Sequence, residues 1–172
     1  TNLIKKSNCL TVLNLHRVSI NDGSSYEPLD PYIFEELLIF LKSHFEIITF
    51  DKLDNLTTSQ KPKLILSFDD GYKDFVDYAV PILDKYKIQA NINIIPSCVE
   101  SNLPPLNVIA EDFIGKAPLE LIKTLSVPGF KLNTYPAFNR KKVGLYLSKF
   151  IKNRSIDEQE SLGKVLIPQF FK

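Results

Sequence analysis

The sequence has no methionine and no tryptophan, and it contains two cysteines and two histidines among 172 residues. Two cysteines, Cys9 and Cys98, do not make a disulfide framework, so we expect a reduced chain. Because methionine is absent, a starting methionine included, we expect that this sequence is not the whole gene product. No run of apolar residues is long enough to cross a bilayer, which excludes a membrane span.

The sequence also lacks an excess of charge of either sign, with a formal net charge of +1. Its longest basic runs, Lys5-Lys6 and Arg140-Lys141-Lys142, are short, and no basic stripe of the kind that binds nucleic acid is present. No signal peptide is visible at the start, although an export signal could have been removed. Together with the unpaired cysteines, this favours a cytoplasmic protein.

What the sequence does contain is typical of a folded α/β protein, with 44% apolar and 24% charged residues. Apolar runs that read as strands alternate with amphipathic stretches that read as helices, and this order predicts a parallel sheet, open or closed into a barrel. The run Lys63–Phe68 is apolar apart from Lys63 and Ser67, as expected for a strand buried on both faces. The expected strands are 10–16, 46–50, 63–68 and 90–95, and the expected helices are 31–43 and a stretch from about Phe75 to Tyr86 that contains Pro81.

The chain is expected to divide near residue 98. Residues 1–98 carry the strand and helix alternation, whereas residues 99–172 show no such alternation and read as a mostly helical insertion. In this second part we expect a loop bounded by Pro96, Pro104 and Pro105, and three helices: one from Pro118 to Leu125, one capped by Asn139, and one that opens with the capping box Ser155–Glu158.

The strongest chemical signal is the triplet Asp69-Asp70-Gly71, which ends the apolar run Lys63–Phe68. Functional groups of parallel α/β proteins gather at the carboxyl ends of strands. Two such close carboxylates resist joint ionisation unless a cation lies beside one of them, which suggests that one ligates a divalent metal and the other acts as a base. Asp and Gly are also common in solvated turns, and the spacing alone leaves both interpretations open.

Four segments, in the same order and spacing, resemble the polysaccharide deacetylase family, which is also called the NodB homology domain or carbohydrate esterase family 4. Leu66–Tyr72 resembles the first signature motif of the family. Leu13–Val18 resembles its "YHRV" segment, Tyr78–Leu83 its "A-x-P-I-L" helix, and Ile88–Ile95 its "PATFF" strand. The resemblance covers about residues 10–98.

This resemblance implies the N-terminal part of a distorted (β/α) barrel that removes N-acetyl, sometimes O-acetyl, groups from an acetylated amino-sugar polymer or oligosaccharide. It implies that Asp69 is the catalytic base and that Asp70 ligates a divalent metal, usually zinc. His16 and Tyr72 are possible pocket residues. A core or capping histidine is an equal alternative for His16, and packing in the core or at its rim is an equal alternative for Tyr72.

The sequence departs from the family at the second motif, His-Ser/Thr-x-x-x-His, which supplies two further metal ligands. His16 and His44 do not have that spacing, and His44 falls near the end of an expected helix. We therefore expect this chain alone to be empty of zinc and inactive, because catalytic zinc usually has three protein ligands. A fragment of a longer enzyme is the favoured explanation, in which a C-terminal part of the same protein is missing; a truncated inactive gene product and a second chain are the others.

Two other functions stay open. A glycosidase would use two carboxylates about 5 Å or more apart that flank the bond, which adjacent Asp69 and Asp70 fit poorly. A non-catalytic carbohydrate-binding or scaffolding relative would keep the fold and lack the histidine ligands.

Overall fold

The computed structural model describes residues 10–55, 61–132 and 138–171, so Cys9 and Lys5-Lys6 lie outside the described residues. Its contacts divide the chain into two compact units. The first unit contains the residues up to Ile20 together with Pro28–Pro96. The second unit contains Asn21–Glu27 and the residues from Ser97 onward. The short segment Asn21–Glu27 therefore packs with residues that follow it much later in the sequence.

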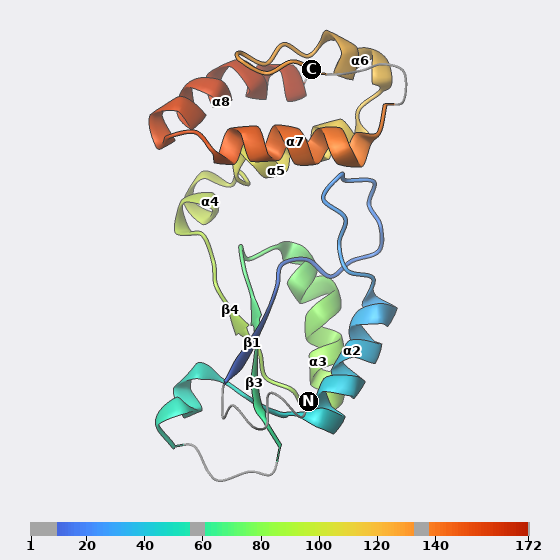
Figure 1. The fold of residues 1–172 in the computed structure, drawn as a ribbon, viewed down its shortest axis with the longest axis vertical. Coiled ribbons are helices and arrows are strands. Elements are labelled where there is room, and N and C mark those ends of the chain that lie inside the picture. The colour runs from blue at the N-terminus through green and yellow to red at the C-terminus, as the bar shows by residue number, and fades with distance from the viewer. Residues whose placement is uncertain (1–9, 56–60, 133–137, 172) are drawn as a thin grey trace. The chain divides into compact units, whose positions relative to one another are not determined.

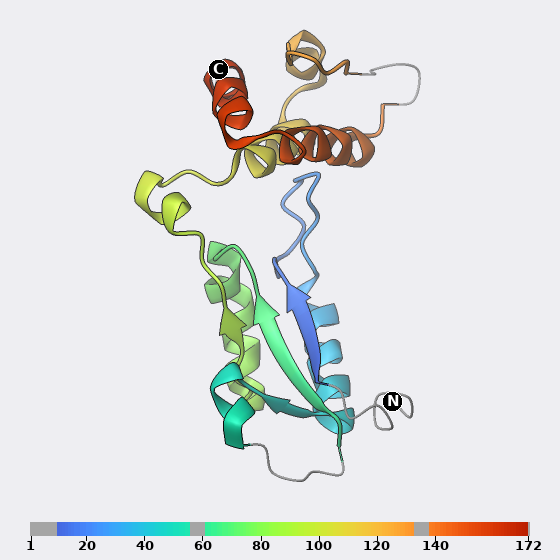
Figure 2. The ribbon, with the colours of Figure 1, turned by 60° about the vertical axis from the view of Figure 1, so that its left-hand side comes forward.

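The first unit is built on a parallel sheet with β3 at its centre, and the described strands are β1 (Thr11–Leu15), β2 (Glu46–Ile48), β3 (Lys63–Phe68) and β4 (Asn91–Ile92) (Figures 1 and 2). Strand β1 pairs with β3 along its whole length, from Thr11 opposite Leu64 to Leu15 opposite Phe68. Strand β2 pairs with the first half of β3, and β4 pairs with its last two residues. The predicted α/β class with parallel strands is confirmed.

Burial of β3 follows from its apolar sequence, since every residue from Leu64 to Phe68 is buried. Helix α2 (Pro31–His44) packs on this strand through side chains such as Phe34 and Leu38. The helix begins as expected, because the Asp30 carboxylate accepts hydrogen bonds from the backbone N–H groups of Tyr32 and Ile33.

Pro81 shapes the helical segment that follows β3. The chain first forms a π-helical turn, Phe75–Ala79, and then continues as α3 (Val80–Tyr86) with Pro81 in its first turn. The backbone N–H of Val80 reaches back five residues to the carbonyl of Phe75. A proline has no N–H to donate and its ring crowds the carbonyl four residues earlier, so the wider turn before it removes the conflict. Pro81 therefore coincides with a change of helix type, from a π-helical turn to an α-helix.

The strand expected over residues 90–95 is shorter in the structure, where β4 comprises only Asn91–Ile92. Strand β3 ends at Phe68, so a longer β4 would have no partner for its backbone groups. The N–H of Asn93 still donates to the Phe68 carbonyl at 2.8 Å, and the chain then enters α4 (Pro96–Ser101). A short 3₁₀ helix, Phe50–Asn55, follows β2.

The second unit is helical, as predicted, and contains α5 (Leu106–Lys116), α6 (Leu119–Thr124), α7 (Arg140–Lys152) and α8 (Ile156–Phe170) (Figure 1). The predicted caps are present: Asn139 accepts from the N–H of Lys142, and Ser155 forms a reciprocal capping box with Glu158. The main residues of the apolar core come from α5, α6, α7 and α8: Ala110, Ile114, Ile122, Leu147, Ile151 and Leu166.

The expectation of a loop bounded by Pro96, Pro104 and Pro105 is wrong in part, because Pro96 opens α4 and Pro105 directly precedes α5. Proline has no N–H to leave unsatisfied and a helical φ, so it is tolerated at the start of a helix as well as in a loop. The apolar face of α5 was the signal that distinguished a helix start from a loop, since most of this helix is buried in the core of the second unit.

The segment Asn21–Glu27 is held against α5 and α7 by close backbone contacts. The hydroxyl and the N–H of Ser25 both donate to the Glu111 carbonyl, at 2.8 Å and 3.3 Å. A Cβ atom at position 115 would overlap the Gly23 carbonyl oxygen, and one at position 144 would lie 2.6 Å from the Ser25 Cβ. Glycines at positions 115 and 144 are therefore what allow the segment to approach these helices.

Glu111 is a buried carboxyl in this core, and we expect its replacement by Gln to stabilise the second unit at neutral pH. Burial raises the pKa of Glu111, while the hydrogen bond from Ser148 and the charge of Lys152 lower it. Its contribution to stability is thus fully present below the ordinary pKa of 4.5 and is lost as pH rises through the raised value in the folded protein. Glu111→Gln should add on the order of 1 kcal/mol at pH 7.

The measurement is urea unfolding between pH 4 and pH 8, in which the variant should lose part of the pH dependence of the wild type. Glu120→Gln is the matched control, because Glu120 is 81% exposed in its pair with Lys123. An equal gain in the free energy of unfolding for both variants, or no gain for Glu111→Gln, would contradict the conclusion that the buried Glu111 carboxylate is destabilising.

Within the described residues, no helix combines the length and the apolar character that a membrane crossing requires.

Candidate functional site

The candidate site lies where β3 ends and the chain turns at Asp69-Asp70-Gly71. Asp70 has a φ of 73° and Gly71 a φ of 69°, so two consecutive residues adopt the left-handed conformation. A side chain at position 71 would crowd Ile94, since a Cβ there would lie 3.0 Å from the Ile94 Cγ2. A non-glycine residue with positive φ is uncommon, and such backbone strain clusters at functional sites. The strained turn at the end of β3 is therefore a candidate functional site.

Asp69, which directly follows β3, is held by groups at the ends of the two strands β1 and β4. Its Oδ2 accepts a hydrogen bond from the Asn14 amide at 2.6 Å, and its Oδ1 accepts one from the Asn93 amide at 2.7 Å. Its backbone N–H donates to the Leu15 carbonyl at 2.9 Å. Because β1, β3 and β4 are parallel, their carboxyl ends meet at one edge of the sheet, and both carboxylate oxygens are fixed there.

These contacts keep Asp69 ionised. The hydrogen bond from Asn93, and then that from Asn14, lower the pKa of Asp69 below its ordinary value, and the nearby charge of His16 acts in the same direction. Partial burial opposes them and has a smaller effect. A carboxylate that receives hydrogen bonds in its charged form stays charged at neutral pH. Asp69 is therefore in the form that accepts a proton.

Asn14 and Asn93 were not predicted as site residues. Asn14 stands in β1, and Asn93 stands in the run 90–95 that was expected to be a strand with apolar residues. Polar amides close to the carboxyl ends of two strands that flank the same central strand were the signal available in the sequence. The sequence could not show which of the several asparagines turn toward Asp69.

Arg17 and Asp74 form a second set of contacts in the first unit. The Arg17 Nε donates to the Asp74 Oδ2 at 2.8 Å, and both side chains are only 11% exposed. The Arg17 guanidinium also lies 5.4 Å from the centre of the Tyr72 ring. This half-buried ion pair links Arg17, which follows His16 in the sequence, to Asp74 in the segment after β3. Tyr72 thus packs beside Arg17, and His16 is half-buried and close enough to Asp69 for its charge to act on the carboxylate.

Asp70 is half-buried and makes no hydrogen bond or ion pair within the described residues. In the same part of the chain, no three His, Cys, Asp or Glu side chains lie close enough to hold a metal ion. Catalytic zinc usually takes three protein ligands. The residues present therefore do not fit a zinc site by themselves.

His44 is not at this site. It is the last residue of α2, where its Nδ1 lies 2.9 Å from the Phe40 carbonyl oxygen and its ring stacks on the Phe40 ring at 4.3 Å. The expected association with the helix end is confirmed, and His44 is not a candidate ligand.

We expect the purified 172-residue chain to retain no stoichiometric zinc after dialysis against a weak chelator. One carboxylate, Asp70, supplies too few ligands for tight binding. Elemental analysis of the dialysed protein measures the zinc content directly. A ratio near one zinc per chain would contradict this prediction.

Fold and site together define an α/β protein with polar groups gathered at the carboxyl ends of parallel strands, where α/β enzymes place their catalytic residues. Residues 56–133 match the family model described as "Polysaccharide deacetylase". The resemblance predicted from the sequence is confirmed, since this stretch is similar to a polysaccharide deacetylase domain.

Several solved structures are similar to parts of this chain. IcaB from Ammonifex degensii is 25% identical with a TM-score of 0.43, over 49% of this chain and 37% of that one. A de-N-acetylase from Aggregatibacter actinomycetemcomitans is 21% identical with a TM-score of 0.45, over 54% of this chain and 39% of that one. The Streptococcus pyogenes deacetylase PplD, solved with acetate, is 23% identical with a TM-score of 0.45, over 54% and 45%.

This chain thus spans less than half the length of each of these proteins. No curated protein matches the sequence.

Proposed function

We propose that this chain is part of a metal-dependent hydrolase that removes N-acetyl groups from a polysaccharide or oligosaccharide, with Asp69 as the catalytic base. The observation that carries the proposal is the Asp69 carboxylate at the carboxyl end of the central strand, where it accepts hydrogen bonds from both Asn14 and Asn93. It lies inside the stretch that matches the polysaccharide deacetylase family.

In this reaction a water attacks the acetamide carbonyl while Asp69 accepts one of its protons. As the C–N bond breaks, the proton held by Asp69 passes to the sugar nitrogen, which leaves as a free amine, and the acetyl group is released as acetic acid, which ionises to acetate. Asn14 and Asn93 prevent rotation of the carboxylate and so keep one lone pair aimed at the water. A positioned base of this kind typically contributes a factor of roughly 10²–10⁴ to the rate.

The expected metal belongs to the same proposal. Asp70 would contribute one ligand to a divalent ion such as zinc, and the remaining ligands would come from outside the described residues. The match to the polysaccharide deacetylase family supports an acetylated amino-sugar polymer or oligosaccharide as the substrate. A cytoplasmic location stays a prediction.

The test is acetate release from N-acetylglucosamine oligosaccharides by the full-length protein that contains this sequence, with zinc supplied. Acetate should appear together with an equal amount of free amine, and a fully deacetylated oligosaccharide should give none. Absence of acetate over a panel of N-acetylated polymers would overturn the proposed activity.

A second candidate, a non-catalytic carbohydrate-binding relative, is favoured by the lack of a metal-ligand cluster in the described residues. The same assay separates the two when binding is measured in parallel by calorimetry. Binding of the oligosaccharide with no acetate release would support the binder. A glycosidase would instead release new reducing ends.

A further inference from the structure

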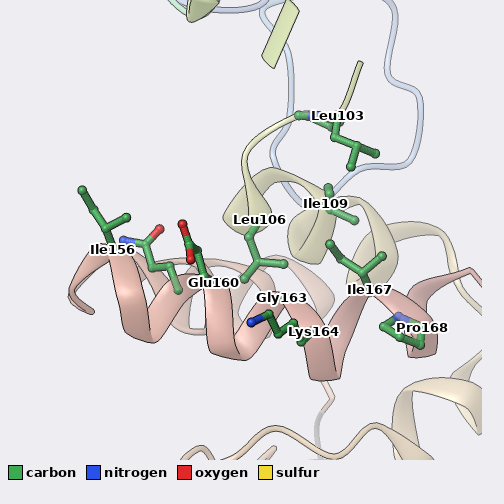
Figure 3. A pocket seen from close by; sticks show the side chains of 11 residues that line it. Leu103, Leu106, Ile109, Ile156, Glu160, Gly163, Lys164, Ile167 and Pro168 are labelled. Atoms are coloured by element: carbon green, nitrogen blue, oxygen red, sulfur yellow. The ribbon is translucent and has the colours of Figure 1, made fainter. Parts of the chain in front are cut away.

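An apolar groove of about 600 Å³ lies in the second unit, between α5, α8 and the segment before α5 (Figure 3). Leu106 and Ile109 of α5 line it on one side, and Ile156 and Ile167 of α8 line it on the other. Leu103 closes one end. Every residue that lines this groove belongs to the second unit, and the proposed function makes no use of it.

The side chains along this groove are unusually exposed for their type. Ile156 is 76% exposed and Leu103 is 43% exposed. Contiguous apolar surface of this kind typically marks an interaction site, because water contact with it is unfavourable. We therefore expect the groove to bind a partner.

Two opposite charges identify that partner. Glu160 and Lys164 lie on the groove face of α8, both are exposed, and neither makes an ion pair within the described residues. Their spacing of four residues would allow a pair within the helix. A ligand with a single sign of charge would attract one of them and repel the other, so the partner surface should carry both signs.

We infer that the groove face of α8 binds the same face of a second copy of this chain, with the two α8 helices antiparallel across a two-fold axis. In an antiparallel pair centred near residue 162, Glu160 of each copy faces Lys164 of the other. The same arrangement places Ile156 opposite Pro168, and both residues line the groove. Two ion pairs and two apolar contacts thus arise from one symmetric contact, as expected for an isologous interface.

Leu103, Leu106 and Ile167 would lose water contact as the second copy covers the groove. The self-complementary charges set the direction of the helices, since a parallel pair would bring like charges together.

Sedimentation of the 172-residue chain over a range of concentrations tests this interface. The wild type should show a reversible monomer–dimer equilibrium. Glu160→Lys and Lys164→Glu should each weaken the dimer by about tenfold or more, because each places like charges opposite one another on both sides of the axis. The double variant, E160K with K164E, restores opposite charges and should recover most of the affinity.

Lys142→Glu provides the control, since Lys142 is an exposed residue of α7 outside the groove and the change in charge is the same as in Lys164→Glu. It should leave the dimer unchanged, and circular dichroism checks that every variant is folded. A wild type that stays monomeric at all concentrations would overturn the inference, and so would a double variant as weak as the single ones. Such results would assign the groove to another occupant.

Discussion

Replacing Asp69 with Asn is expected to slow acetate release by the full-length protein by roughly 10²–10⁴-fold. The amide cannot accept the proton of the attacking water. The substitution also replaces one carboxylate oxygen by an NH₂ group. This NH₂ group cannot accept the hydrogen bond that Asn14 or Asn93 donates, so one of the two hydrogen bonds is lost. The measured quantity is kcat/KM for an N-acetylated oligosaccharide at neutral pH.

Asp77→Asn is the matched control for this experiment. Asp77 is 43% exposed, pairs with Lys73 at 2.6 Å and lies in the π-helical turn outside the Asp69 contacts. Its replacement should change the rate less than about twofold, since surface substitutions away from special features have small effects. An Asp69→Asn enzyme that keeps half of the wild-type rate while remaining folded would remove Asp69 from the catalytic role.

Replacing Phe68 with Ala is expected to destabilise the first unit by about 3–5 kcal/mol. Phe68 is fully buried at the end of β3 and meets the Phe34 ring edge-on, with 5.8 Å between the ring centres. The centre of the Phe75 ring also lies 4.7 Å from that of Phe68. Loss of the ring leaves a cavity among side chains that come from β3, α2 and the π-helical turn, and these cannot all collapse into it.

Urea unfolding followed by circular dichroism measures this loss. Phe50→Ala makes the same chemical change at a side chain that is 45% exposed and should cost less than about 1 kcal/mol. Equal losses at the two positions would show that Phe68 does not anchor the core of this unit. Because Asp69 follows Phe68 directly, a folded Phe68→Ala protein is also expected to hold the Asn14 and Asn93 clamp less firmly.

Local signals in the sequence were sufficient for much of the fold. The apolar run 63–68 defined the central strand, Asp30 with Pro31 defined the start of α2, and the Ser155–Glu158 box defined the start of α8. These elements depend on interactions within a few residues, or on burial so complete that the pattern is unmistakable. Residues that are common in two kinds of structure led to a wrong prediction. Pro96 and Pro105 were expected in a loop, but proline is also common at helix starts, where the structure places both.

The candidate site divides in the same way. The triplet Asp69-Asp70-Gly71 and its family motif were visible in the sequence, because adjacent carboxylates after a buried strand are a local feature. The clamp on Asp69 was not, because Asn14 and Asn93 lie 55 and 24 residues away and only strand pairing brings them together. The ion pair between Arg17 and Asp74 has the same origin.

By itself, therefore, the sequence determined the class of fold, the central strand and the residue proposed as the base. Only the tertiary structure decided which side chains hold that base ionised, how Pro81 widens the turn after it, and that Asn21–Glu27 packs with the second unit. The physical reason is that strand register and helix packing join residues distant in sequence, and no local pattern records which of several similar side chains will meet.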